Sequence, residues 1–145
     1  MTMSTQEISD RLELKQLVDQ FSNYADTKEN DKQVKLFAPD GQVNIINNGE
    51  VTFSLKGRDA IEQAFSQSMD DYQSVFHMSG QHTVDFLDAT HATGVAYNYV
   101  VLVKLVDGKP QTTQEGVRYE DRYEKIAGHW LITERNSHFN WHLDL

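Results

Sequence analysis

The sequence predicts an α+β domain in which helices come first and long strands follow. Helical patterns dominate the chain before Ser74, and four strand-length segments fill the remainder. The chain has 145 residues, which suits one domain, and no linker or internal repeat divides it. We therefore expect a single domain over residues 1–145, with three helices packed on one face of a curved, mostly antiparallel sheet.

The first helix is predicted over residues 6–25. Its apolar side chains recur at steps of three and four residues, the spacing of one buried stripe: Ile8, Leu12, Leu14, Leu17, Val18 and Phe21. Ser4 or Thr5 is a suitable N-cap. A second, short helix is predicted over residues 31–37, because Pro39 disfavours helix at the residue before it.

A hairpin is predicted next. Two apolar segments, residues 42–46 and 51–55, flank an Asn48-Gly49 pair, which supplies the positive φ angles of a tight turn. The third helix is expected to begin after Gly57, with Asp59 as its cap.

Four long strands complete the predicted fold, over residues 75–87, 93–106, 111–126 and 130–141. Asp107-Gly108 and Ala127-Gly128 separate the last three, so an antiparallel meander is expected. Strands of this length usually bend, and we expect a bulge near Gly80, Gly94 or Gly116.

The strand over residues 93–106 is apolar on both faces. One face carries Val95, Tyr97, Tyr99, Val101, Val103 and Leu105, and the other carries Ala96, Asn98, Val100, Leu102 and Val106. Such a strand is covered on both sides. We expect helices on one side and a second copy of the sheet on the other, which makes a homodimer. The next strand alternates Arg118, Glu120, Arg122 and Glu124 on one face, which is typical of a solvated or interface surface.

The face toward the helices is expected to mix apolar residues with a few polar ones: Tyr97 or Tyr99, Tyr119, Asp121, and Asn136 or His138. This mixture suits a cavity for a small hydrophobic ligand. It equally suits a packed core in which each hydroxyl finds a local partner. The residues alone leave both interpretations open.

Composition excludes several functions. There is no cysteine, so disulfides, thiolate metal sites and cysteine nucleophiles are excluded. The net charge of −9 argues against binding to nucleic acid or to an anionic membrane. The N-terminal residues show no signal peptide and no apolar run is long enough to span a membrane, so we expect a cytoplasmic protein.

The histidines indicate acid–base chemistry more than metal binding. His77 and His82 are expected on opposite faces of one strand, His138 and His142 are too far apart in extended chain, and no metal, phosphate-loop or nucleophile-elbow motif occurs. Asp26, at a helix end, and His77, early in a strand, remain as a candidate pair. A carboxylate that receives one imidazole N–H leaves the other nitrogen free to take a proton. The alternative is that both residues are structural, with Asp26 as a helix cap or turn residue and His77 as a core residue.

Three segments resemble a known family: Tyr24-Ala-Asp26 with Leu36-Phe-Ala-Pro39, Phe76-His77-Met78-Ser-Gly80, and Tyr123 to Trp130. They are similar to the SnoaL-like branch of the NTF2-like superfamily, with its cone-shaped α+β fold. Within that branch they look closest to the scytalone dehydratase and bile-acid 7α-dehydratase families. The resemblance spans roughly residues 8–140.

The resemblance implies that Asp26 is the catalytic carboxylate and His77 the general base, with no cofactor and no metal. It places Tyr119 at a substrate-contacting position and Phe21 where a family tyrosine lies. Further candidate substrate contacts are Tyr24, Tyr97, Tyr99, His138 and Trp141. Leu102 stands at the position of a second family histidine, and Ala25 at that of a family tyrosine before the acid.

The implied function is a cofactor-free lyase, a dehydratase, or an isomerase acting on a small hydrophobic, ring-bearing carbonyl or hydroxy compound. Two alternatives remain open at this point: a non-catalytic binding module, or an accessory subunit of a larger enzyme. Residues 139–145 could close the pocket as a lid or pack at a dimer edge.

Overall fold

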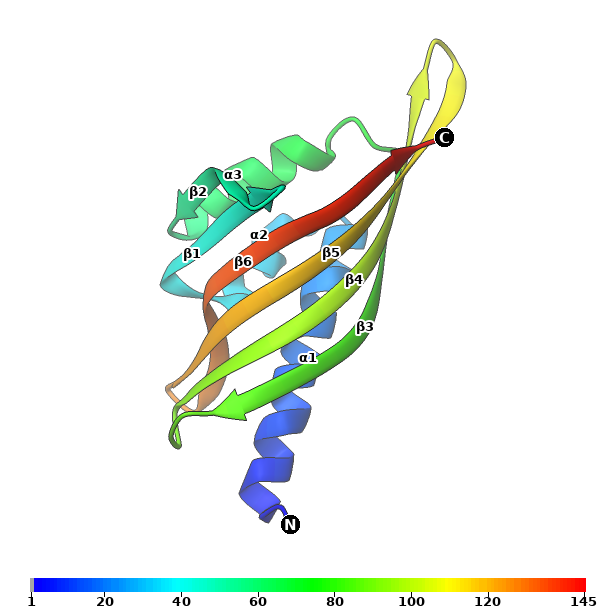
Figure 1. Ribbon diagram of the computed structural model, residues 1–145. Helices are drawn as coiled ribbons and strands as arrows, with labels where there is room; N and C mark the ends of the chain where they lie inside the picture. Colours follow the sequence, from blue (N-terminus) through cyan, green and yellow to red (C-terminus); the bar gives the residue numbers. More distant parts are fainter. Residues whose placement is uncertain (1) are drawn as a thin grey trace.

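The computed structural model describes residues 2–145 and contains a six-stranded sheet with helices on one side (Figure 1). The elements are α1 (Thr5–Asp26), α2 (Asn30–Gln33), a 3₁₀ turn (Val34–Leu36), β1 (Phe37–Asn47), β2 (Glu50–Lys56), α3 (Arg58–Met69), β3 (Ser74–Phe86), β4 (His91–Val106), β5 (Lys109–Ile126) and β6 (His129–Asp144). The α+β prediction is confirmed. No helix among the described residues is long and apolar enough to cross a membrane.

The strand order in the sheet is β2-β1-β6-β5-β4-β3. The last four strands form the expected antiparallel meander, and β1 and β2 form the expected hairpin. The β1–β6 pair is parallel, so the sheet is mixed. Strand β3 is an edge strand, and this exposes one side of its backbone to α1.

Helix α1 begins where the sequence places it. The Ser4 side chain accepts a hydrogen bond from the Glu7 backbone N–H at 3.1 Å. Leu14 and Phe21 are buried, but Ile8 and Leu12, which were expected in the same stripe, are exposed. Asp10 and Leu14, two residues before and after Leu12, are buried against the sheet, so Leu12 lies on the opposite side of the helix.

Two local predictions are wrong. The second helix is divided into α2 and a 3₁₀ turn, and Phe37 already begins β1, which runs through Pro39 with an irregular register before Gln42. Asp59 lies inside the first turn of α3, and Gly57, with φ of 85°, holds the cap position. A positive φ there is available to glycine at little cost.

The predicted turns are present, with positive φ angles at Asn48-Gly49, Asp107-Gly108 and Ala127-Gly128. The register shifts next to Gly80 and Gly116 confirm two of the three expected bulge positions. Gly94 lies in continuous register. A Cβ there would come within 2.7 Å of the Tyr123 ring, so this glycine leaves room for a buried aromatic side chain.

The two faces of the sheet are distinct. The inner face, turned toward the helices, holds the core and includes Ala96, Val100, Leu102, Val117 and Tyr119. The outer face, turned away from α1, has no helix against it among the described residues (Figure 1). The alternating charged residues Arg118, Glu120, Arg122 and Glu124 of β5 lie on the outer face, whereas Asp121 is buried on the inner face.

The Asp10 carboxylate links α1 to the end of the sheet at the β5–β6 turn. Asp10 Oδ1 accepts hydrogen bonds from Trp130 Nε1 at 2.9 Å and from Lys125 Nζ at 3.0 Å. Burial alone would raise the pKa of Asp10, but these hydrogen bonds outweigh it and lower the pKa below the ordinary value. The folded state therefore favours the charged carboxylate.

We expect Asp10→Asn to lower the free energy of unfolding by about 1–3 kcal/mol near neutral pH. Since the pKa of Asp10 is lower in the folded state, its contribution is present above about pH 4 and is lost as pH falls through the folded value. Urea unfolding from pH 7 to pH 3 should show that the free energies of unfolding of the wild type and Asp10→Asn become equal at acid pH. A constant difference across this range would contradict the assignment.

Candidate active site

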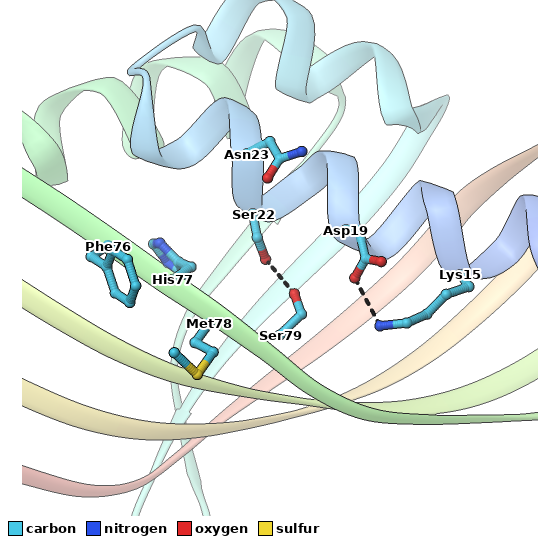
Figure 2. A pocket seen from close by; sticks show the side chains of 8 residues that line it. All are labelled: Lys15, Asp19, Ser22, Asn23, Phe76, His77, Met78 and Ser79. Carbon is cyan, nitrogen blue, oxygen red and sulfur yellow. Dashed lines mark hydrogen bonds and ion pairs between the residues drawn. The ribbon is translucent and has the colours of Figure 1, made fainter.

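The C-terminal half of α1 crosses β3 in the opposite direction and touches it at two levels. Ser22 and Asp26, one helical turn apart, share one side of α1, and His77 and Ser79 share the inner face of β3. Ser22 Oγ lies 3.1 Å from Ser79 Oγ (Figure 2). Asn98 Nδ2 on β4 donates to Ser22 Oγ at 3.2 Å. One turn further on, Asp26 meets His77.

Asp26 accepts hydrogen bonds from both the backbone and the ring of His77. The backbone N–H donates to Oδ1 at 2.9 Å and to Oδ2 at 3.1 Å, and ring Nδ1 lies 2.7 Å from Oδ1. The backbone bond exists because β3 is the edge strand, so this N–H has no neighbouring strand to bind. The His77 side chain is 8% exposed and that of Asp26 27%.

The contact determines the tautomer of His77. An ionised carboxylate only accepts, so Nδ1 carries the proton. In the neutral ring, Nε2 is then unprotonated and can accept a proton from a bound molecule. The predicted pair is thus assembled with the orientation that a general base needs.

A groove of about 420 Å³ runs along the gap between α1 and β3 (Figure 2). Its lining is part polar and part apolar: Lys15, Asp19, Ser22, Asn23, Phe76, His77, Met78 and Ser79. The groove is open to solvent, and its size falls within the range of small-molecule sites. His77 is the base candidate in its wall.

A buried ion pair lies deeper under α1. Arg135 donates from Nε and Nη2 to the two oxygens of Asp121, both at 2.8 Å. Its guanidinium carbon lies 3.9 Å from the centre of the Tyr119 ring and 4.3 Å from that of Phe21. Arg135 Nη1 is buried and has no hydrogen-bond partner among the described residues. A buried donor in this condition is costly unless something binds it.

Asp121 also organises the polar residues behind Arg135. Tyr123 Oη donates to Asp121 at 2.7 Å and lies 3.0 Å from His82 Nε2, which therefore donates to the phenol oxygen. Burial lowers the pKa of His82 and raises those of Tyr119 and Tyr123. Burial opposes the charge of Arg135, but Asp121 raises its pKa above the ordinary value. Arg135 is therefore a permanent cation.

Of the remaining candidates, Phe21 and Tyr119 lie together on the inner side, with ring centres 5.8 Å apart. Tyr24 is half-buried on α1. It lies two residues before Asp26, about 200° around the helix axis, and so faces away from the pair.

Tyr97, Tyr99, His138 and Trp141 lie on the outer face. Tyr97 is paired with Arg118, Tyr99 with Gly116, and these with His138 and Trp141. The expectation that Tyr97 or Tyr99, and Asn136 or His138, face the helices is wrong. Alternation separates two faces without saying which one meets the helices, and a bulge in β6 reverses the side for Asn136 and His138. Residues 139–144 continue β6 beside β5 and form no lid in this structure.

Sequence reasoning missed Arg135. A strict two-residue period places it on the face opposite Ile132, whereas the register shift between Arg122 and Tyr123 turns it inward. Among residues 2–145 no group of three or more His, Asp or Glu side chains is arranged to hold a metal.

A family model described as "SnoaL-like domain" matches residues 6–136. The chain belongs to this family. An uncharacterized protein of Mycobacterium tuberculosis is 27% identical over 135 residues, covering 92% of this chain and 87% of that protein. Thus both the family and a sequence relative extend across nearly the whole domain.

Solved structures share the fold. A putative scytalone dehydratase from Novosphingobium aromaticivorans has a TM-score of 0.83 at 17% identity, over 99% of this chain and 92% of that one. A hexachlorocyclohexane dehydrochlorinase from Novosphingobium barchaimii has a TM-score of 0.79 at 17% identity, over 97% and 92%. Proteins described as cystatin-like and NTF2-like are also similar. The SnoaL-like, NTF2-like resemblance is confirmed.

We expect the neutral His77 ring to be protonated at Nδ1. Long-range ¹H–¹⁵N spectra of the imidazole should show this tautomer in the wild type and a smaller share of it in Asp26→Asn, because an amide oxygen is a weaker acceptor than a carboxylate. Asp88→Asn, which alters the exposed Asp88–His91 pair, is the matched control and should leave the His77 signals unchanged. An Nε2–H tautomer in the wild type would contradict the geometry.

We expect Asp121→Asn to lower the free energy of unfolding by about 3–5 kcal/mol, because it leaves the Arg135 cation buried without a counter-charge. The exposed Arg122–Glu134 pair provides the comparison, and Glu134→Gln should cost about 0–1 kcal/mol. Urea denaturation followed by circular dichroism measures both. If both variants lost the same small free energy of unfolding, burial of the Arg135 charge would not depend on Asp121, and the prediction would be wrong.

Proposed function

We propose that this protein is a lyase of the dehydratase type, or an isomerase, working by acid–base chemistry of Asp26 and His77. The observation that supports this most is the 2.7 Å contact that orients His77 Nδ1 toward the carboxylate and leaves Nε2 free. His77 also lines the groove between α1 and β3, where a bound molecule could reach it.

The reaction would start with proton transfer from a substrate carbon to His77 Nε2. Asp26 stabilises the imidazolium that forms. In an elimination, the electrons of the C–H bond form a C=C bond as the neighbouring C–O bond breaks. The imidazolium then gives its proton to the departing hydroxide, which leaves as water, so His77 returns to its starting state. In an isomerisation, it returns the proton to another carbon.

Arg135 would supply the electrostatic part of the reaction. Its guanidinium is stacked on Phe21, which precedes Asp26 by five residues, or about 7.5 Å along a helix. The free Nη1 donor can hold an enolate oxygen or a departing anion, and in a dry environment such a donor is worth much more than in water. This role would explain why an unsatisfied buried donor is retained.

The substrate would be a small hydrophobic ring bearing a hydroxyl, carbonyl or other leaving group. Ser22 and Ser79 offer hydroxyls on the side of β3 where His77 points, and Phe21 and Tyr119 offer aromatic surface on the inner side of the sheet. The similar structures add support of a general kind, since dehydration and dehydrochlorination are both eliminations. We expect the ligand to enter between α1 and β3.

A thermal-shift screen of hydroxy-, keto- and halogen-bearing ring compounds tests this proposal, followed by turnover assays on each compound that binds. Ligand at about 100 times its dissociation constant adds about 2.7 kcal/mol, which moves the melting midpoint by several degrees. For a substrate found in this way, Asp26→Asn and His77→Gln should each lower kcat by about 10²–10⁴-fold while the protein remains folded.

The exposed Asp88–His91 pair again provides the matched control, and Asp88→Asn and His91→Gln should retain full activity. Binding without turnover, unchanged in the Asp26 and His77 variants, would favour a binding module. No binding at all, together with co-purification of a larger chain, would favour an accessory subunit. Either outcome would contradict the lyase proposal.

A further inference from the structure

Ser79 presents two hydrogen-bond donors beside His77, and the mechanism proposed above gives neither of them a step. His77 and Ser79 both point to the inner face of β3, with Met78 between them on the outer face. Residues two apart in a strand lie about 7 Å from each other. Both residues line the groove between α1 and β3, so a bound molecule can reach the two of them together.

The first donor is the Ser79 hydroxyl, which ends a chain of hydrogen bonds that begins at Asn98. Asn98 Nδ2 donates to Ser22 Oγ at 3.2 Å. The Ser22 proton has two acceptors within reach: Ser79 Oγ at 3.1 Å and Asn98 Oδ1 at 3.5 Å. The shorter contact makes Ser22 the donor to Ser79 (Figure 2). Ser79 then keeps its own proton for a molecule in the groove, and the chain strengthens that hydrogen bond.

The second donor is the Ser79 backbone N–H. The His77 backbone N–H points away from β4 and binds Asp26, because β3 is the edge strand. Pairing with β4 is continuous from His77 to Ser79, and N–H groups two residues apart in a strand point the same way. The Ser79 N–H therefore also points away from β4. Ser22 contacts Ser79 through the hydroxyl, so this N–H takes its partner from water or from a bound molecule.

We propose that the hydroxyl and the backbone N–H of Ser79 hold a carbonyl oxygen of the substrate while His77 removes a proton from the neighbouring carbon. This inference rests on the proposed function and adds Ser79 to it as a catalytic residue. The imidazole nitrogen approaches the carbon at about 3–3.5 Å. The two bonds from that carbon to the oxygen span about 2.4 Å, and a hydrogen bond from Ser79 adds about 2.8 Å. A bent arrangement of these three lengths fits the spacing of the two residues.

The step that Ser79 assists is an enolisation. The electrons of the C–H bond form a C=C bond, the C=O bond becomes a C–O⁻ single bond, and the proton goes to His77 Nε2. Donors aimed at this oxygen stabilise the enolate more than the ketone, because the charge develops there. When the C=O bond re-forms in an elimination, a C=C bond forms one position further on, and the hydroxyl on that carbon leaves with the His77 proton as water. The inference therefore requires a ring ketone, since a ring that carries only a halogen gives Ser79 no oxygen to hold.

Exchange of the α-hydrogens of 1-tetralone for deuterium tests this step with a simple ring ketone as the probe. In D₂O near neutral pD, proton NMR should show that the wild type catalyses the exchange. Ser79→Ala should lower the catalysed rate about 10²-fold, the usual effect of removing one donor to a developing oxyanion. Ser79→Thr keeps a hydroxyl and should retain most of the rate. Ser74→Ala is the matched control, since Ser74 is an exposed serine on the outer face of the same strand, and it should leave the rate unchanged.

The infrared C=O stretch of bound 1-tetralone, labelled with ¹³C at the carbonyl, reports the same hydrogen bonds directly. A donor to the oxygen weakens the C=O bond, so the band should lie at lower frequency on the wild type than on Ser79→Ala. A purely structural role of Ser79 would not move this band. Ser22→Ala should give an intermediate frequency, because it removes the link to Asn98 and leaves the Ser79 hydroxyl in place.

The outcomes separate this inference from the proposed function. Exchange that is lost in His77→Gln but kept in Ser79→Ala would overturn the role of Ser79 and support His77 as the base. Exchange that neither substitution changes would contradict both. A wild type that does not catalyse exchange, or a C=O band at the same frequency on the wild type and Ser79→Ala, would also overturn the role of Ser79. Circular dichroism melts should show each variant folded, and if Ser79→Ala does not fold, the C=O band on Ser22→Ala decides.

Discussion

The Asp26 carboxylate is the contact on which the geometry of the site depends. An edge strand leaves alternate backbone N–H groups without a partner, and such groups must bind something when a helix covers them. Asp26 satisfies the His77 backbone N–H and the His77 ring together. The same side chain therefore holds α1 against β3 and selects the tautomer of His77. The Ser22–Ser79 contact, one turn earlier, is a second side-chain contact between α1 and β3.

The Asp121–Arg135 pair differs from the Asp26 contact, because a gain in stability does not explain why this pair is buried. Burying two charges costs several kcal/mol for each ion, and apolar residues of similar volume often serve a core as well or better. Here the bidentate contact, the Tyr123 hydroxyl and the two aromatic rings compensate part of that cost, yet Nη1 remains unbound. Retaining a cation with a free donor under α1 makes physical sense when an anion or a developing negative charge occupies the site. A core designed only for packing would not need it.

Much of the architecture could be predicted from the sequence because it follows from local rules. The helix over residues 6–25, the Asn48-Gly49 hairpin and the turn at Ala127-Gly128 each depend on neighbouring residues alone, and all are present. Elimination left Asp26 and His77 as a candidate pair, and the resemblance supplied the reason to join these residues, which are 51 positions apart in the chain. Arg135 could not be found in this way. If β5 and β6 paired without a bulge from the Ala127-Gly128 turn, Glu134 would lie opposite Asp121. One extra residue in β6 shifts the register, so that Arg135 lies opposite Asp121 instead. Nothing in the local sequence fixes that insertion, because it depends on how the long strands twist against α1.

The two faces of the sheet divide its surface between two kinds of contact. On the inner face, Ser22, Asn98, Tyr119 and Arg135 place polar groups among apolar ones. On the outer face, exposed apolar and aromatic side chains such as Tyr99 and Trp141 lie together. Because strand residues alternate between faces, a single strand such as β4 supplies both: Asn98 and Val100 inward, Tyr99 and Val101 outward. Apolar residues on both faces of β4 therefore predict that both faces make contacts. They do not show which face meets the helices. The inner face is the one that α1 covers, because Asp26 of α1 binds His77 on that face of β3.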